Sequence, residues 1–132
     1  MKPPSPRSPQ VTALLRQLPA PVQALVEATR TLAFTTLPGV IETVDAKARI
    51  IGYGYGPGYR GLVATIILSR QGVKLGLVRG SELPDPSRLL EGAGKIHRHI
   101  PLTTLPDVHR APVRALLRAA LAAWKKRAAV DP

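Results

Sequence analysis

The fold of this chain is decided by residues 51–77, which read IGYGYGPGYRGLVATIILSRQGVKLGL. Isoleucine and tyrosine alternate with glycine at the start of this stretch, and residues 62–68 form a continuous β-branched and apolar run, a composition that favours strands. Residues 69–72, Ser-Arg-Gln-Gly, suit a hairpin turn, and residues 73–77 place their apolar side chains on one face of the next strand. These segments predict an antiparallel meander.

Helical patterns flank this region on both sides. Ser8 and Pro9 are typical of a helix cap and a first helical residue, and a short amphipathic stripe follows them. A second helix is expected around residues 22–33. A C-terminal helix is expected from about Pro112, and its apolar face predicts that Trp124 is a core anchor against the sheet.

The segment between the meander and the last helix carries its own turn signals. Residues 85–92 predict a helical segment of one or two turns, capped by Asp85 and ended by Gly92. Residues 97–102 alternate like a strand, and a further short strand is expected near Val40. The sequence therefore predicts a two-layer α+β domain, in which a curved antiparallel sheet of about four to five strands is packed by N-terminal helices and a C-terminal helix.

Composition is that of one globular domain. The chain has 132 residues, 45% of them hydrophobic and only 4% aromatic, so we expect one mainly aliphatic core over residues 10–128. Residues 1–9 are interpreted as a disordered proline-rich tail and residues 129–132 as a second tail. The absence of cysteine suits the cytoplasm, and no apolar run approaches the roughly 20 residues of a membrane-spanning helix.

The chain is strongly basic. Lysine and arginine number 19 against 8 acidic residues, for a net charge of +11, and leaving out Lys2 and Arg7 still gives 17 against 8, or +9. A positive charge of this size favours the binding of a small anionic ligand, an acidic protein partner or, weakly and without sequence specificity, nucleic acid. We expect a monomer or a small homo-oligomer.

The preferred binding site is a small-anion site after the predicted short helix. Glycine backbone N–H groups next to cationic side chains suit an anion. The alternative is that the glycines cap the helix and the cations are merely solvated. The site residues are Gly92, Gly94, Lys95, Arg98 and His99.

Residues 56–61 match the pattern G-x-G-x-x-G, but a dinucleotide site requires a helix after that pattern, and here a strand is expected. We interpret the segment as a turn between strands. The alternating glycines before it, Gly52, Gly54 and Gly56, could also let another backbone or a ligand lie close to the sheet.

Metal binding and catalysis have weaker support. His97 and His99 have a spacing known among metal ligands, with His109 as a candidate third ligand, whereas the alternative leaves one histidine hydrogen-bonded in the fold and the other exposed. No motif supplies a nucleophile with a positioned base or a carboxylate pair, so we do not expect an enzyme.

Four basic residues lie along one side of the predicted last helix, within about a quarter-turn of one another. They predict a basic stripe that could follow a nucleic-acid backbone, and the alternative is a solvated face whose arginine stems cover apolar surface. The stripe consists of Arg110, Arg114, Arg118 and Lys125.

Residues 82–100, ELPDPSRLLEGAGKIHRHI, resemble the signature of the YdhG-like family, also called domain of unknown function 1801, and a weaker likeness covers residues 10–127. The resemblance implies a compact α+β fold with a curved antiparallel sheet and, for one branch, a frataxin-like iron chaperone. Iron would require clustered carboxylates, and this chain has eight, scattered among its cations. We therefore expect a non-enzymatic binding or interaction module, with an iron chaperone and a nucleic-acid binder as alternatives.

Overall fold

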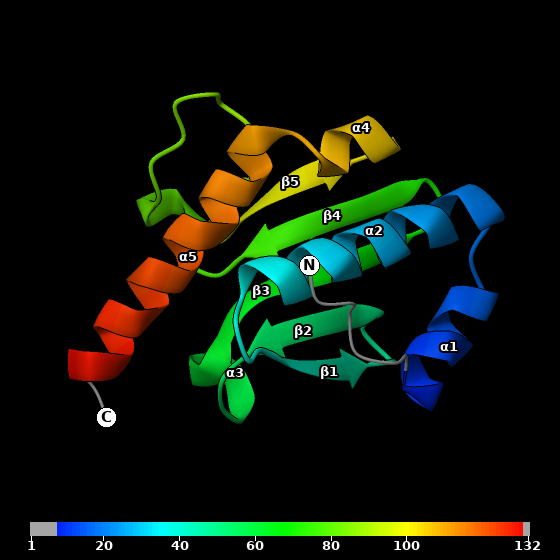
Figure 1. The fold of residues 1–132 in the computed structure, drawn as a ribbon, viewed down its shortest axis with the longest axis horizontal. Helices are drawn as coiled ribbons and strands as arrows, with labels where there is room; N and C mark the ends of the chain where they lie inside the picture. The colour runs from blue at the N-terminus through cyan, green and yellow to red at the C-terminus, as the bar shows by residue number, and fades with distance from the viewer. Residues whose placement is uncertain (1–7, 131–132) are drawn as a thin grey trace.

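Five antiparallel strands form the centre of the structure, a computed structural model that describes residues 8–130. Each strand lies beside the next one in the chain, in the order β1-β2-β3-β4-β5, so the predicted meander is confirmed (Figure 1). The strands are β1 (Ile41–Asp45), β2 (Ile50–Gly54), β3 (Leu62–Ser69), β4 (Gly72–Leu77) and β5 (Arg98–Leu102).

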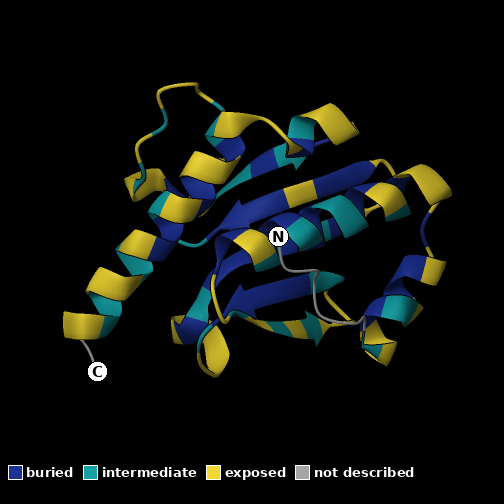
Figure 2. Cartoon of the chain, viewed as in Figure 1, coloured by how far each residue is buried: buried dark blue, intermediate teal, exposed yellow. Residues whose placement is uncertain are grey.

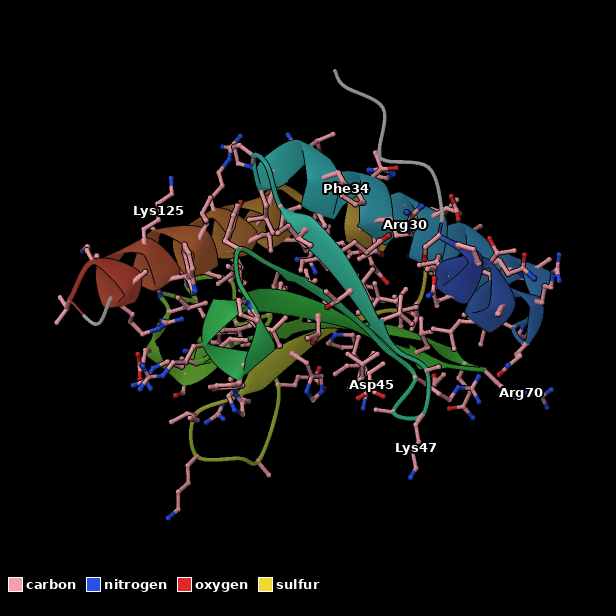
Figure 3. All side chains as sticks on the ribbon, turned by 90° about the horizontal axis from the view of Figure 1, so that it is seen from below. Arg30, Phe34, Asp45, Lys47, Arg70 and Lys125 are labelled. Atoms are coloured by element: carbon pink, nitrogen blue, oxygen red, sulfur yellow. The ribbon has the colours of Figure 1, made fainter. Side chains whose placement is uncertain are left out.

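Helices cover one face of this sheet. The two long helices α2 and α5 pack side by side across it (Figure 1), and the edge-on view in Figure 3 shows them together above the strands. The predicted α+β domain, packed by an N-terminal and a C-terminal helix, is thus confirmed. The helical elements are α1 (Pro9–Arg16), α2 (Ala20–Thr36), α3 (Gly58–Gly61), η1 (Gly80–Glu82), α4 (Leu105–Val108) and α5 (Ala111–Val130).

The first residues of α1 and α5 follow the sequence signals closely. Ser8 caps α1 by accepting a hydrogen bond from the backbone N–H of Val11 at 3.2 Å. Pro112 lies in the first turn of α5, where its missing N–H costs nothing. Helix α5 continues to Val130, two residues beyond the predicted end of the domain, and the remaining predicted tail residues, 1–7 and 131–132, lie outside the described part of the chain.

The core lies between the helices and the sheet. Its buried hydrophobic residues are aliphatic apart from Tyr53, as the composition predicts, and Figure 2 shows which parts of the chain are buried. The prediction for Trp124 is right only in part: its ring is half-buried at the edge of the core, and it packs on Tyr55 with 5.1 Å between ring centroids. None of the helices within residues 8–130 combines the length and the apolar character needed to cross a membrane.

A buried polar cluster ties α2 to the sheet. The Arg30 guanidinium, 1% exposed, donates from Nε and Nη2 to the two carboxylate oxygens of Glu42 at 2.8 and 2.9 Å, and the Tyr53 hydroxyl donates to the same carboxylate at 2.6 Å. Burial and the Glu42 charge raise the pKa of Tyr53, and the Glu42 hydrogen bond raises that of Arg30. Phe34, which Figure 3 labels beside Arg30 on α2, packs on both partners of Glu42.

The predicted helix over residues 85–92 is wrong. Asp85 and Arg88 form a turn, in which Arg88 has a left-handed φ of 54°, and the chain beyond it is extended. The Asp85 carboxylate does cap backbone N–H groups, those of Leu89 and Leu90 at 2.9 Å, but it satisfies them without a helix. The turn lays these two leucines, both half-buried, against the core.

Candidate functional site on the open face of the sheet

The face of the sheet opposite α2 and α5 carries a row of five residues, one from each strand. Strand register places them side by side as Thr43, Gly52, Thr65, Gly76 and His99. Because neighbouring strands lie about 4.8 Å apart, a glycine between two polar side chains leaves a gap of roughly 10 Å between their backbones. The row therefore forms hollows separated by polar groups.

The threonines lean into these hollows. A side chain at Gly76 would collide with the Thr65 hydroxyl, and one at Gly52 would lie 2.9 Å from the Thr43 hydroxyl. Glycine in a strand interior gives up packing and stability, so its use here marks a place where the surface must stay open. Sequence patterns suggested a close approach near Gly52, but Gly76 and both threonines were missed, because only the register brings them together.

A cavity of about 380 Å³ occupies the hollow over Gly76. Thr65, Gly76 and His99 lie along its floor, and Tyr59 and His97 are among the residues that form its walls. Leucine and isoleucine side chains complete an apolar lining, and the loop before β5 closes one side. Figure 3 shows this loop below the sheet, on the side away from the long helices.

The loop over residues 92–97 is fixed at its base. Glu91 and His99 exchange two backbone hydrogen bonds, of 2.8 and 2.9 Å, across the base of the loop. Inside it, the Arg98 guanidinium donates to the carbonyl oxygens of Gly94 and His97 at 2.5 and 2.7 Å. Arg98 therefore holds the loop in shape, and this occupies one of its nitrogens.

The structure brings together four of the five residues of the predicted anion site. Gly92, Gly94, Arg98 and His99 all line the cavity. Lys95 lies on the exposed tip of the same loop and is not part of the lining. The predicted cap role of Gly92 fails with the helix, although its φ of 142° does place it outside the ordinary region.

His97 connects the loop to two neighbouring turns. Its Nδ1 accepts the backbone N–H of Arg79 at 3.4 Å, and its Nε2 lies 3.2 Å from the Tyr59 hydroxyl. A ring that accepts at Nδ1 in its neutral form carries its proton on Nε2, so His97 donates to Tyr59. This leaves the hydroxyl proton of Tyr59 free for another partner. Tyr59 was not predicted, although an aromatic residue in a glycine-rich turn was a usable signal.

Several polar groups of the cavity have no partner among residues 8–130. They are the hydroxyl of Thr65, the imidazole of His99 and the backbone N–H groups of Gly92 and Gly94. Gly92 and Gly94 are exposed and Thr65 and His99 are half-buried, so water can hydrogen-bond these groups in the free protein. A ligand with oxygen atoms could satisfy these groups, since they include three kinds of donor.

The candidate metal ligands do not converge. His109 ends α4, while His97 and His99 lie at the cavity, and no group of three histidine, aspartate or glutamate side chains in the described part of the chain could hold a metal ion. Of the two nearer histidines, the hydrogen-bonded one, His97, is exposed, and His99 is half-buried.

Residues 56–61 form a turn between strands, as predicted, with the one-turn helix α3 inside it. The glycines serve a close approach of two backbones: Tyr55 donates its N–H to the Gly61 carbonyl at 2.9 Å, and a side chain at Gly54 or Gly61 would collide with main-chain atoms. For Gly54, the alternative of a close backbone approach is thus confirmed.

The basic stripe is exposed along its length. Arg110 lies just before α5, and Arg114, Arg118 and Lys125 lie on its exposed side; Figure 3 shows Lys125 pointing away from the sheet. Helix α5 contains no acidic residue, so no carboxylate within it offsets this charge.

Comparisons with known proteins give no further guide to the site, since no family model, curated protein or solved structure matches this chain.

Proposed function

We propose that this chain is a cytoplasmic, non-enzymatic binding module of the YdhG-like kind that takes a small anionic ligand in the open-face cavity. The kinship is supported by agreement between the fold that the resemblance implies and the five-stranded antiparallel sheet packed by helices. The binding role is supported by the cavity itself.

The observation that carries the proposal is the row Thr65, Gly76 and His99. Two side chains without hydrogen-bond partners in the described chain flank a residue that has no side chain, inside a cavity of about 380 Å³. Such a volume is within the range of small-molecule sites. Binding would satisfy the side chains and the N–H groups of Gly92 and Gly94 together.

The charge of the cavity favours an anion over a cation. Arg98 carries a positive charge in its lining, and no aspartate or glutamate is among the lining residues. The guanidinium of Arg98 keeps donors beyond the nitrogen that holds the loop. A phosphate or carboxylate would meet hydrogen-bond donors on the floor and on the loop.

Calorimetric titration with inorganic phosphate and with acetate tests this proposal. Thr65→Val and His99→Phe keep the shape of the site and remove its donors, so each should weaken binding about fivefold, the effect of one hydrogen bond. Lys95→Ala is the matched control, since it removes a charge from the same loop outside the lining, and it should change affinity less than twofold. No heat with the unmodified protein, or an equal loss in Lys95→Ala, would contradict the proposal.

The exposed stripe favours a second candidate, weak binding of nucleic-acid backbones. Arg114, Arg118 and Lys125 lie on a helix without acidic residues. Phosphate contacts of this kind make the affinity fall steeply with salt. Changing both arginines to glutamine should lower the slope of log affinity against log salt by about two for double-stranded DNA, and an unchanged slope would exclude the stripe as the contact surface.

A further inference from the structure

A second hollow lies on the open face, on the β1 side of the open-face cavity, and nothing in the proposed function uses it. It has a volume of about 390 Å³ and lies among the start of β1, the end of β2 and the turn that leads into β3. Strand register places Ile41, Gly54 and Leu62 side by side, and all three line the hollow. We call it the glycine hollow, after Gly54, Gly56 and Gly58 in its lining.

The lining of the glycine hollow is mainly apolar. Its described lining residues include no lysine, arginine, aspartate or glutamate, and their only hydroxyl groups are those of Thr43 and Tyr59. Ile41 and Tyr59, two large side chains in this lining, are 55% and 52% exposed. Single exposed apolar residues are ordinary, but two that line the same concavity mark a place for an apolar group of a ligand.

Main-chain atoms give the hollow a flat wall. A side chain at Gly54 would collide with the Gly61 carbonyl group, so the backbones of the strand and the turn lie against each other with no side chain between them. Gly58 adds open main-chain surface, since no other atom lies within 4 Å of where its Cβ would be. A planar aromatic ring suits such a wall, and it could also contact the ring of Tyr59 face to face or edge-on.

Tyr59 and Leu62 join the glycine hollow to the open-face cavity, because both residues line both. The Tyr59 ring packs edge-on against the His97 ring, with 5.6 Å between centroids, and its hydroxyl lies 3.2 Å from His97 Nε2. Leu62 leans over the sheet, since a side chain at Gly52 would come within 2.9 Å of its Cδ2. The surface between the two hollows is therefore apolar, and Tyr59 is held in place beside it.

The two hollows differ in charge and are separated by a distance that the strand spacing sets. The open-face cavity lies over Gly76 on β4, and the glycine hollow lies beside Gly54 on β2. Two strand spacings separate these positions by about 10 Å. Arg98 brings a positive charge to the first, and no charged side chain is among the described lining residues of the second. A ligand that fills both hollows would be anionic at one end and apolar at the other.

From this arrangement we infer that the ligand of the open-face cavity is an aryl-alkyl anion, a phosphate or carboxylate joined by an alkyl linker to an aromatic ring. The anionic group binds over Gly76, and the linker crosses Leu62. The ring lies in the glycine hollow between Ile41 and Tyr59. This inference rests on the proposed function, since it requires that the anionic group binds in the open-face cavity.

Calorimetric titration with phenylpentyl phosphate, which carries its ring at the end of the chain, tests the inference, and phenylhexanoate is the carboxylate form. Phenylpentyl phosphate should bind at least tenfold more tightly than pentyl phosphate, because burial of the ring adds apolar contact. It should exceed phenyl phosphate by a similar factor, since a ring without a linker does not reach the glycine hollow. Phenylpentanol lacks the anionic group and should bind at least tenfold more weakly than the phosphate.

Ile41→Ala should weaken phenylpentyl phosphate binding about fivefold, because part of the apolar wall is lost, and should leave inorganic phosphate binding unchanged. Leu105→Ala is the matched control, since it shortens a side chain that is 46% exposed on α4 and outside both linings, and it should change either affinity less than twofold. Thr43→Phe places a ring of the protein in the hollow, so phenylpentyl phosphate should then bind no more tightly than pentyl phosphate.

Thr65→Val separates this inference from the proposed function, because it should weaken inorganic phosphate and phenylpentyl phosphate alike, whereas Ile41→Ala should weaken only the latter. Equal binding of phenylpentyl and pentyl phosphate, with inorganic phosphate still bound, would overturn the inference alone. The same holds if Leu105→Ala weakens binding as much as Ile41→Ala. Phenylpentanol that binds as tightly as the phosphate would overturn the anion site and the inference together. Near-ultraviolet circular dichroism of each variant checks that the fold is intact.

Discussion

The two faces of the sheet differ in how their polar groups are paired. On the covered face, the side chains of Arg30, Glu42 and Tyr53 bind one another in the closed cluster described above. On the open face, Thr65 and His99 lie beside a glycine, and neither side chain has a hydrogen-bond partner in residues 8–130. The first arrangement stabilises the fold, and the second leaves donors for a ligand.

This difference predicts that the polar groups of the covered face contribute to stability and those of the open face to ligand binding. A buried polar group without a partner costs about 1–3 kcal/mol, so substitutions in the covered cluster should act mainly on stability. The side chains of Thr65 and His99 have no protein partner in residues 8–130, so their loss should act mainly on binding. If substitutions in the covered cluster changed mainly binding, or open-face substitutions changed mainly stability, this assignment of roles to the two faces would be wrong.

The largest expected effect is that of Glu42→Gln. The change keeps the shape of the side chain but removes the carboxylate charge from the bidentate pair with Arg30, whose side chain is 1% exposed; Glu27 lies farther away, at 4.0 Å. Breaking a buried ion pair from one side should lower the free energy of unfolding by about 3 kcal/mol, measured by urea denaturation. Glu82→Gln is the control, since it breaks a similar pair with Arg79 that is exposed, and it should leave stability nearly unchanged.

Tyr53→Phe should cost about 2 kcal/mol near neutral pH, because a hydrogen bond to a charged carboxylate is lost in a site that is 0% exposed. Burial raises the pKa of Tyr53 in the folded protein above the value of about 10 found in unfolded chains. Above about pH 10 only the unfolded chain releases this proton. The stability from Tyr53 is therefore fully present below that pH and falls by up to about 1.4 kcal/mol per pH unit above it.

The pH dependence of unfolding provides a control for the Tyr53→Phe experiment. Phenylalanine has no proton to release, so the difference in unfolding free energy between the wild type and Tyr53→Phe should narrow as the pH rises above about 10. Urea denaturation at several values from pH 8 to pH 11 measures it. A difference that stays constant over this range would show that the cluster does not hold Tyr53 in its protonated form.

Gly76→Ala tests whether the open face depends on the absence of a side chain at position 76. The new methyl group would collide with the Thr65 hydroxyl, so we expect a loss of about 1 kcal/mol and a loss of phosphate binding. In a Thr65→Ala background the collision is gone, and alanine should be neutral or stabilise the strand by roughly 0.5–1 kcal/mol. Thermal denaturation of the four proteins measures this coupling, and additive effects would show that Thr65 does not lean over Gly76.

How much could be predicted from the sequence depends on whether a feature is set by near neighbours in the chain or by the packing of distant segments. The strands with alternating side chains, the helix starts marked by proline and the turn at residues 69–72 could all be predicted, because each depends on near neighbours in the chain. Arg30 was readable in principle: it lies four residues after Val26, on the apolar stripe of α2, where a charge requires a partner. The identity of that partner, Glu42, depends on how α2 packs against β1.

Residues 85–92 show where local signals fail. Asp, Pro and Gly mark a turn as well as a short helix, and here tertiary pairing decides, since the bridge between Glu91 and His99 draws the chain into an extended path. Thr104 and Asp107 form a capping box that starts α4, a local signal that was present and overlooked. The open-face row could not be predicted, because the register of all five strands sets it.

Tyr59→Phe is the smallest expected effect and the closest match to Tyr53→Phe. Both substitutions remove one tyrosine hydroxyl, but Tyr59 is 52% exposed and its hydroxyl meets a histidine ring instead of a buried carboxylate. Water can replace that partner, so the free energy of unfolding should change by less than about 0.5 kcal/mol. A loss as large as that of Tyr53→Phe would mean that the contact between Tyr59 and His97 holds the open face together, and that this face, too, is built for stability.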